Sequence, residues 1–266
     1  MYLYSKLKKY NKEINIAIIG CGKFSTMFLA QFNYIKKVSI LCILDLDIDK
    51  SIKNCISAGL DKDKLKKIKF TDSIEELLKF DELDIVIEAT GDPKSGIKNA
   101  EKVINSYKNL IMVNVEADAV AGKYLSDLAT KNNVIYSMAY GDQPSLILEL
   151  IEWANLNGFD IICAGKGTKY HSSFEYSTPD TVWKNYGISA EEAKNAGMNA
   201  KIFNSFITGD KSSIEMAAVL NASNMTVPLK GLTYPSLSVD DLPKKLIPKK
   251  YGGLLNKKNQ VEVISC

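Results

Sequence analysis

The feature that most constrains this chain is an apolar run that leads directly into a glycine turn. Residues Ile14–Ile19 are continuously apolar except for Asn15, and Gly20-Cys21-Gly22-Lys23-Phe24-Ser25 follows them before a helical pattern. Such a run is typical of a strand buried in a parallel sheet. Gly20 permits the tight turn, Gly22 lets a pyrophosphate approach the backbone, and the helix N-terminus offers free N–H groups. The segment predicts a dinucleotide-binding turn with Ser25 at its third small position; the alternative is a bare structural turn.

An acidic residue lies twenty positions beyond Ser25, at the end of the next apolar run, Val38–Leu44. At this place Asp45 is expected to bond the adenosine ribose hydroxyls. All 34 basic side chains are lysines, so no guanidinium is available to bind a 2′-phosphate. The expected cofactor is therefore NAD or NADP, with NAD slightly favoured. The alternative is that Asp45 is a simple turn residue.

Further apolar runs alternate with helix signals in the first half of the chain. The runs are Asp84–Glu88, Leu110–Val113 and Val134–Tyr136. The helix signals are a capping-box pattern at 72–75, Pro93 opening a helix that runs to about Ser106, and Asp118 as the expected cap of a helix over 119–131. This alternation predicts an α/β protein with a Rossmann-type doubly wound parallel sheet, helices covering both faces.

Two polar segments follow strands of this expected sheet. They are Glu88-Ala89-Thr90-Gly91-Asp92 and Asn114-Val115-Glu116. Loops at the carboxyl ends of parallel strands lie beside the bound dinucleotide in such folds. We therefore expect Ala89, Thr90, Gly91 and Asn114 to contact the cofactor, and Glu116 to lie near its nicotinamide end. A solvated loop is the alternative for Glu116.

The alternation of apolar runs and helix signals changes near Tyr140, and this change predicts a second domain. We expect an N-terminal tail at 1–12, a dinucleotide-binding domain at 13–140, and an α+β domain for substrate binding and association at 141–266. The regular elements expected in the last part are helices over Pro144–Leu156, Glu191–Ala200 and Ser212–Ala222, and strands over Phe159–Cys163 and Val261–Ile264. Four prolines after Val227 predict irregular chain there.

The second half carries polar residues suited to substrate chemistry. Lys166 and Lys169 fall in the glycine-rich segment Ala164–Lys169, expected to be a loop, where lysines can hold an anion or exchange a proton. We expect one of them to be catalytic, with Asp142 and Glu116 as its orienting partners. The expected substrate contacts are Gln143, the single histidine His171, and Lys211. A structural role is the alternative for His171, as is a surface pair with Glu215, four residues on, for Lys211.

Composition excludes several classes of function. The net charge is only +3, and the lysine-rich stretch at 62–69 alternates with aspartate, so no nucleic-acid partner is expected. Five scattered cysteines and one histidine predict no metal site; Cys42 and Cys163 read as core residues, and a reducing compartment fits. No signal peptide or membrane span is expected. The chain is thus expected to be cytoplasmic, with a small-molecule substrate and a homo-oligomeric assembly.

Several short motifs, in their order and spacing, resemble one enzyme family. The motifs are IEATG at 87–91, MVNVEAD at 112–118, YGDQP at 140–144, AGKGTKY at 164–170, STPDTVW at 177–183 and IEMAA at 214–218. Together, over roughly Asn15 to Val263, they resemble the homoserine-dehydrogenase-like oxidoreductases, in particular the 1-deoxy-D-xylulose 5-phosphate reductoisomerase-like enzymes. The resemblance implies NAD(P)-dependent chemistry, and its isoprenoid-forming members reduce a rearranged sugar phosphate.

Two departures from that family shape the functional expectation. Val115 follows Asn114 where homoserine dehydrogenases carry a catalytic lysine, so homoserine oxidation is not expected. The usual C-terminal SAF-like domain is also expected to be lacking. We therefore expect an NAD(P)-dependent oxidoreductase acting on a small polyol, sugar acid or sugar phosphate, reductoisomerase-type chemistry included. The alternative is a catalytically weak dinucleotide-binding or regulatory subunit.

Overall fold

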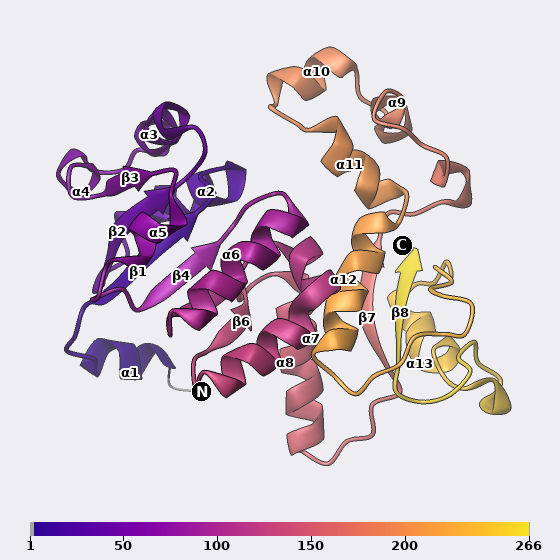
Figure 1. Cartoon of the computed structure of the whole chain (residues 1–266). Coiled ribbons are helices and arrows are strands. Elements are labelled where there is room, and N and C mark those ends of the chain that lie inside the picture. The colour runs from indigo at the N-terminus through magenta and orange to yellow at the C-terminus, as the bar shows by residue number, and fades with distance from the viewer. Residues whose placement is uncertain (1–2, 266) are drawn as a thin grey trace. The chain divides into compact units, whose positions relative to one another are not determined.

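The computed structural model describes residues 3–265, and Met1, Tyr2 and Cys266 lie outside the described residues. The chain divides into two compact units, Met1–Ala139 and Tyr140–Cys266, each with its own sheet (Figure 1). The segment expected as a tail carries a short helix, α1 (Leu3–Lys9). No helix among residues 3–265 has both the length and the apolar character that crossing a membrane requires.

The first unit is built on a six-stranded parallel sheet. Its strands are β1 (Ile14–Ile19), β2 (Val38–Leu44), β3 (Lys69–Thr71), β4 (Ile85–Glu88), β5 (Asn109–Met112) and β6 (Tyr136–Met138). They lie in the order β3-β2-β1-β4-β5-β6, and every neighbouring pair is parallel. This is the Rossmann order, so the expected fold class is confirmed. Strand β3 was not predicted, because its three residues form no apolar run.

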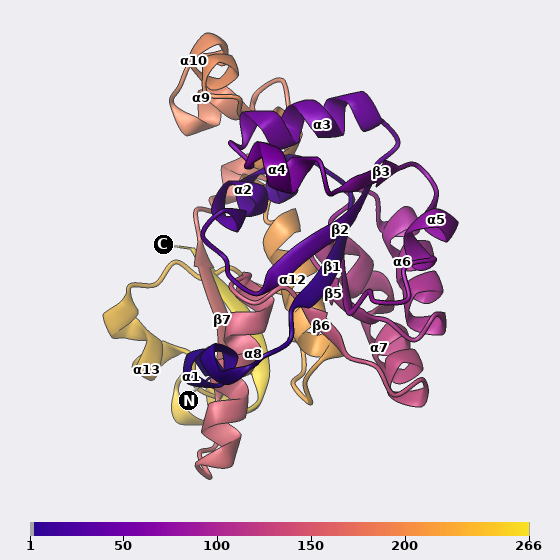
Figure 2. The same cartoon turned by 90° about the vertical axis from the view of Figure 1, so that its left-hand side faces the viewer.

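Side chains of the central strands alternate between two cores because successive residues of a strand point to opposite faces. In β1, Ala17 and Ile19 enter one core, and Ile16 and Ile18 enter the other. Helices cover both faces, on opposite sides of the strands in Figure 2. The first core is covered by α5 (Ile74–Leu78), α6 (Pro93–Asn105) and α7 (Val115–Lys131). The second core is covered by α2 (Lys23–Phe32) and α3 (Ile48–Ser57), and Leu65 of α4 (Lys62–Leu65) also packs against it.

Side-chain caps set where these helices begin. Asp92 accepts a hydrogen bond from the Ser95 N–H at 2.7 Å, and α6 begins at Pro93 as expected. The expectation that Asp118 caps the next helix is wrong. Asn114 caps α7, accepting from the Ala117 N–H at 3.0 Å, and the helix begins one turn earlier because this strong cap lies only two residues beyond the end of β5. Ser73, within the predicted capping segment, caps α5.

The second unit combines a two-stranded parallel sheet with helices. Strands β7 (Cys163–Thr168) and β8 (Gln260–Ser265) pair along their full length. The main helices are α8 (Gln143–Leu156), α9 (Val182–Tyr186), α10 (Ala190–Asn195), α11 (Ala200–Ile207), α12 (Asp210–Asn221) and α13 (Leu242–Lys245), with 3-10 turns at Ser172–Phe174, Val239–Asp241 and Lys249–Tyr251. Buried residues of α8, α12 and β8 form its core.

Two expectations for the second unit need correction. The strand expected at Phe159–Cys163 lies later, so the glycine-rich segment with Lys166 is a strand and not a loop. A Cβ at Gly165 would lie 1.8 Å from the Glu262 carbonyl oxygen, so glycine there lets β8 pair closely. The helix expected at Glu191–Ala200 is two helices, because the chain turns at Gly197 (φ +64°) and restarts at the Asn199 cap.

Candidate dinucleotide site and substrate-side polar cluster

The glycine turn after β1 packs against the loop after β4. Gly20 has a φ of +89°, and a Cβ there would lie 2.9 Å from the carbonyl carbon and oxygen of Ala89 and from the Thr90 nitrogen. Only glycine meets both demands without strain. The strand order reverses between β1 and β4, the place where open α/β sheets bind ligands at their carboxyl edge. The structure thus brings Gly20, Ala89 and Thr90 together there.

The start of α2 faces open space. Gly22 is its N-cap and has no side-chain capping bond, and a Cβ at Gly22 would meet no atom within 4 Å. The buried Ser25 hydroxyl donates to the Gly20 carbonyl at 2.5 Å and closes the turn from behind. Lys23 and Phe24 are exposed in the first turn of the helix. The arrangement leaves backbone N–H groups and a positive helix end for an anion.

Asp45 is bonded directly to this turn. Its Oδ2 accepts from the Cys21 N–H at 2.6 Å, and its Oδ1 accepts from the Asp47 N–H at 3.1 Å. The Cys21 thiol points inward and lies 3.7 Å from the Ser51 carbonyl oxygen. Only the backbone of Cys21 therefore faces the turn, and its N–H already donates a hydrogen bond to Asp45.

A buried polar group organises the loop after β4. Glu88 is fully buried, and its Oε1 accepts from the Thr90 hydroxyl at 2.5 Å and from the Asn99 amide at 3.4 Å. The Asn114 amide donates to the Thr90 hydroxyl at 3.4 Å and to the Asp92 carbonyl at 3.1 Å. Burial raises the pKa of the Glu88 carboxyl. The structure thus gathers three expected cofactor residues, Ala89, Thr90 and Asn114, with Gly91 following on the same loop.

In the second unit, Lys166 forms a largely buried ion pair with Glu215. The Lys166 Nζ lies 2.5 Å from the Glu215 Oε2, and the two side chains are 13% and 5% exposed. Glu215 lies on the buried side of α12 with Ser212 and Val219, so its carboxylate is not on the surface of the helix. Sequence analysis did not name it as a functional residue. Its position three residues after Ser212 and four before Val219, on the apolar side of the helix, is the signal that marks it.

Most of the other residues of this unit that were predicted to be functional are more exposed than Lys166. Lys169 is exposed, with its Nζ 5.0 Å from the centre of the Tyr186 ring. His171 is exposed and caps a 3-10 turn, its Nδ1 accepting from the Ser173 N–H at 3.2 Å. Asp142 caps α8 by accepting from the Gln143 N–H at 2.9 Å, and Gln143 is exposed. The observed partner of Lys166 is thus Glu215, whereas Asp142 holds a helix end.

Three further polar side chains, those of Glu116, Lys211 and Tyr234, lie near the starts of helices. Glu116 is half-buried in the first turn of α7 in the first unit, and Lys211 is half-buried in the first turn of α12 in the second. At the start of α12, the Tyr234 hydroxyl donates to the Gly209 carbonyl at 2.8 Å and lies 2.9 Å from the Ser213 hydroxyl. Burial raises the pKa of Tyr234.

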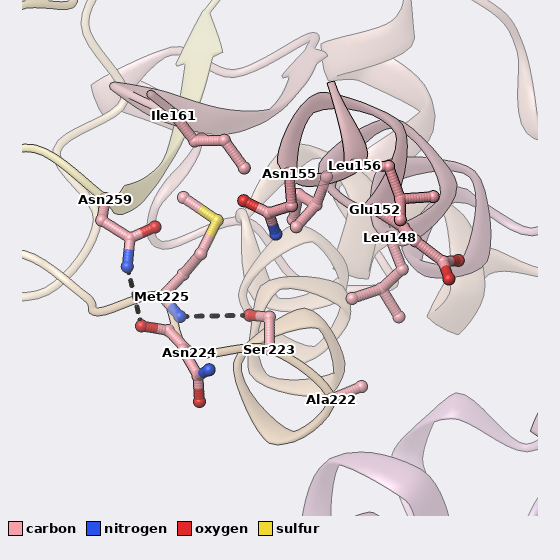
Figure 3. A pocket seen from close by; sticks show the side chains of 11 residues that line it. Leu148, Glu152, Asn155, Leu156, Ile161, Ala222, Ser223, Asn224, Met225 and Asn259 are labelled. Atoms are coloured by element: carbon pink, nitrogen blue, oxygen red, sulfur yellow. Dashed lines mark hydrogen bonds between the residues drawn. The ribbon is translucent and has the colours of Figure 1, made fainter. Parts of the chain in front are cut away.

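A hollow of about 570 Å³ lies elsewhere on the second unit (Figure 3). It is bordered by α8 and by the chain after α12, and the Asn259 amide at its edge donates to the Asn224 carbonyl at 2.8 Å. None of the residues predicted to be catalytic or substrate-binding lines it. The polar cluster around Lys166 is therefore a separate feature.

The second unit is similar to a known family of oxidoreductases. Residues 141–266 match the family model described as oxidoreductase DRL, catalytic domain. These residues, slightly less than half of the chain, are similar to an oxidoreductase catalytic domain. The match confirms the expected enzyme class, and it covers the strand that carries Lys166 and the helix that carries Glu215. No curated protein has a sequence that matches this chain.

Solved structures share parts of the fold. The chain is similar to the S. aureus homoserine dehydrogenase, with 24% identity over 51% of this chain and 33% of that one (TM-score 0.39). It is similar to the Bordetella pertussis WlbA dehydrogenase, solved with NADH and UDP-GlcNAcA, with 16% identity over 62% and 50% (TM-score 0.45). It is also similar to the Synechocystis biliverdin reductase, with 15% identity over 60% and 48% (TM-score 0.40). The matched parts are a third to a half of those chains, and TM-scores below 0.5 add no evidence on activity.

Proposed function

We propose that this protein is an NAD(P)-dependent oxidoreductase acting on a CH–OH group or the matching carbonyl of a small polyol, sugar acid or sugar phosphate. The observation that carries the proposal is the buried Lys166–Glu215 ion pair, because it lies within the residues that match the oxidoreductase catalytic-domain model. The first unit supports it with a Rossmann sheet whose glycine turn is open toward a ligand. Reductoisomerase-type chemistry on a sugar phosphate is one form of this proposal.

The residues of the first unit fit a nicotinamide dinucleotide. The missing side chain of Gly22 leaves a cradle that a Cβ would begin to fill, beside the uncapped N-terminus of α2 for the pyrophosphate. Asp45 would hold the adenosine ribose, and Thr90 and Asn114 would border the nicotinamide half. The bound cofactor would supply the hydride chemistry. NAD is favoured over NADP because the Asp45 carboxylate repels a 2′-phosphate and the chain has no arginine.

In this proposal, the second unit transfers the proton that the reaction requires. Reduction of a carbonyl needs a proton at the oxygen as hydride arrives at the carbon, and oxidation of an alcohol needs the reverse. The Lys166 ammonium would give or take this proton at Nζ. Glu215 fixes that ammonium by a charge-assisted hydrogen bond. Lys211, Gln143 and His171 are proposed contacts for the polar or anionic groups of the substrate, with Lys169, Glu116 and Asp142 as further candidates.

The experiment is a substrate panel with the full chain. Polyols, sugar acids and sugar phosphates are offered with each dinucleotide in both directions, and nicotinamide absorbance is followed. We expect turnover of at least one member that requires Lys166. Tight dinucleotide binding without turnover across the panel would favour the alternative of a regulatory dinucleotide-binding subunit. Absence of dinucleotide binding would contradict the proposal itself.

A further inference from the structure

Glu88 is a buried carboxyl that the proposed chemistry leaves unused. It ends β4 with no exposed surface. Its hydrogen-bond partners, the Thr90 hydroxyl and N–H and the Asn99 amide, are uncharged. Among the described residues, its Oε2 has no hydrogen-bond partner. Burying a carboxyl without a cation is costly, so a residue kept in this state calls for a specific account.

The bonds that Glu88 makes are directed at the loop after β4. Its Oε1 takes both polar groups of Thr90, the hydroxyl at 2.5 Å and the N–H at 3.4 Å. The same Thr90 nitrogen and the Ala89 carbonyl lie 2.9 Å from the place of a Cβ on Gly20. A continuous set of contacts therefore runs from Glu88 through Thr90 to the glycine turn.

Helix α6 makes room for this arrangement. A Cβ at Gly96 would lie 3.2 Å from the Glu88 Oε2 and 2.8 Å from the Asn114 Nδ2. Only a glycine at this point of the helix leaves space for both polar groups. Because Asn114 also bonds Thr90, the loop is held from two sides. The buried carboxyl thus belongs to a built support behind the loop.

We propose that Glu88 is a positioning residue for the dinucleotide, fixing Thr90 and the 89–91 loop against Gly20 in the conformation that the cofactor contacts. The inference rests on the proposed dinucleotide site, and Glu88 itself touches no cofactor. Its action passes through the Thr90 hydroxyl and N–H.

The protonation of Glu88 predicts how dinucleotide affinity should depend on pH. Burial raises its pKa above the ordinary 4.5, so the carboxyl keeps its proton over a range where exposed glutamates have lost theirs. The titratable groups that face it are Tyr136 on β6, and beyond it Asp118 on α7, which the Tyr136 hydroxyl bonds. Ionisation would place an uncompensated charge behind the loop. Dinucleotide affinity should therefore be full at low pH and fall as pH rises through the raised pKa.

The test measures calorimetric dissociation constants for NAD with the full chain from about pH 4, near the ordinary pKa, to about pH 8. The variants are Glu88→Ala, Glu88→Gln and Asp118→Asn, the last a matched change of a second buried carboxyl that bonds Tyr136. We expect Glu88→Ala to weaken binding about tenfold, the effect of losing one or two hydrogen bonds. Glu88→Gln should stay within about threefold of wild type at low pH and lose the pH dependence, while Asp118→Asn keeps it.

The outcomes separate this inference from the proposed function. A folded Glu88→Ala variant with wild-type affinity overturns the inference. So does a Glu88→Gln variant whose affinity still falls with pH as the wild type does, and this variant keeps the shape and the acceptor oxygen needed for folding. A wild-type chain that binds neither NAD nor NADP overturns the proposed dinucleotide site instead.

Discussion

The Asp45 carboxylate accepts a hydrogen bond from the Cys21 backbone N–H at 2.6 Å, joining the end of β2 to the turn that follows β1. A second bond from the Asp47 N–H holds the other oxygen. The carboxylate is therefore fixed in orientation before any ligand arrives. Such preorganisation lowers the entropic cost of binding a ribose at this point.

The first prediction concerns cofactor choice at Asp45. Asp45→Ala removes a charged acceptor, so NAD affinity should fall by about 10-fold to 100-fold, the range for a hydrogen bond to a charged group. NADP affinity should change less, because the repulsion of its 2′-phosphate is also removed. Calorimetry with both dinucleotides gives the ratio. Asp47→Ala is the control: it removes the cap of α3 and costs about 1 kcal/mol of stability without moving the ratio.

The second prediction separates the roles of Lys166 and Lys169 in the second unit. Lys166→Ala should reduce turnover by about 100-fold or more, because it removes the proposed proton donor, while NAD affinity stays nearly unchanged. Lys169→Ala is the comparison variant, and it should lose less activity because it removes an exposed ammonium that lies over the Tyr186 ring. Steady-state rates on the substrate found in the panel decide the matter. Equal losses in both variants, or a loss confined to Lys169→Ala, would remove Lys166 from the catalytic role.

The third prediction concerns stability against pH at Asp118. Burial raises the pKa of this carboxyl above its ordinary 3.8, so the folded state binds more protons than the unfolded state between the two values. Its contribution to stability is therefore highest below the ordinary pKa and falls as pH rises toward the raised one. Asp118→Asn keeps an acceptor for Tyr136 and should gain stability relative to wild type as pH rises. Urea unfolding of both proteins at about pH 4, near the ordinary pKa, and at about pH 8 tests this; a constant difference would contradict it.

The local sequence pattern was sufficient to predict an element where the residues of one segment determine its structure by themselves. The bounds of β1 and β2 follow from runs of apolar residues that suit a strand buried on both faces. The start of α7 was misplaced because two good caps, Asn114 and Asp118, lie four residues apart, and only the strand before the first one decides between them.

Features that depend on distant packing could not be predicted in the same way. Glycines in β7 indicate a loop in isolation, and the approach of β8 to Gly165 turns them into strand residues. Lys166 was identified, but its partner Glu215 lies 49 residues away, and the local pattern of that helix does not indicate which lysine Glu215 meets. The role of Glu88 likewise depends on space left by Gly96 in the following helix.

Dinucleotide binding at the glycine turn is the central claim, and Gly22→Val tests it most directly. Gly22 has an extended backbone (φ −82°, ψ −158°) and no atom within 4 Å of a Cβ, so valine fits the folded chain without strain. Ser126→Val, at an exposed position of α7, is the control for the added apolar volume. Calorimetric titration with NAD and NADP should show binding to wild type and to the control. Gly22→Val, at an unchanged melting temperature, should bind at least about 100-fold more weakly, because the side chain occupies the place of the pyrophosphate. Unchanged affinity in a folded Gly22→Val protein would contradict the account.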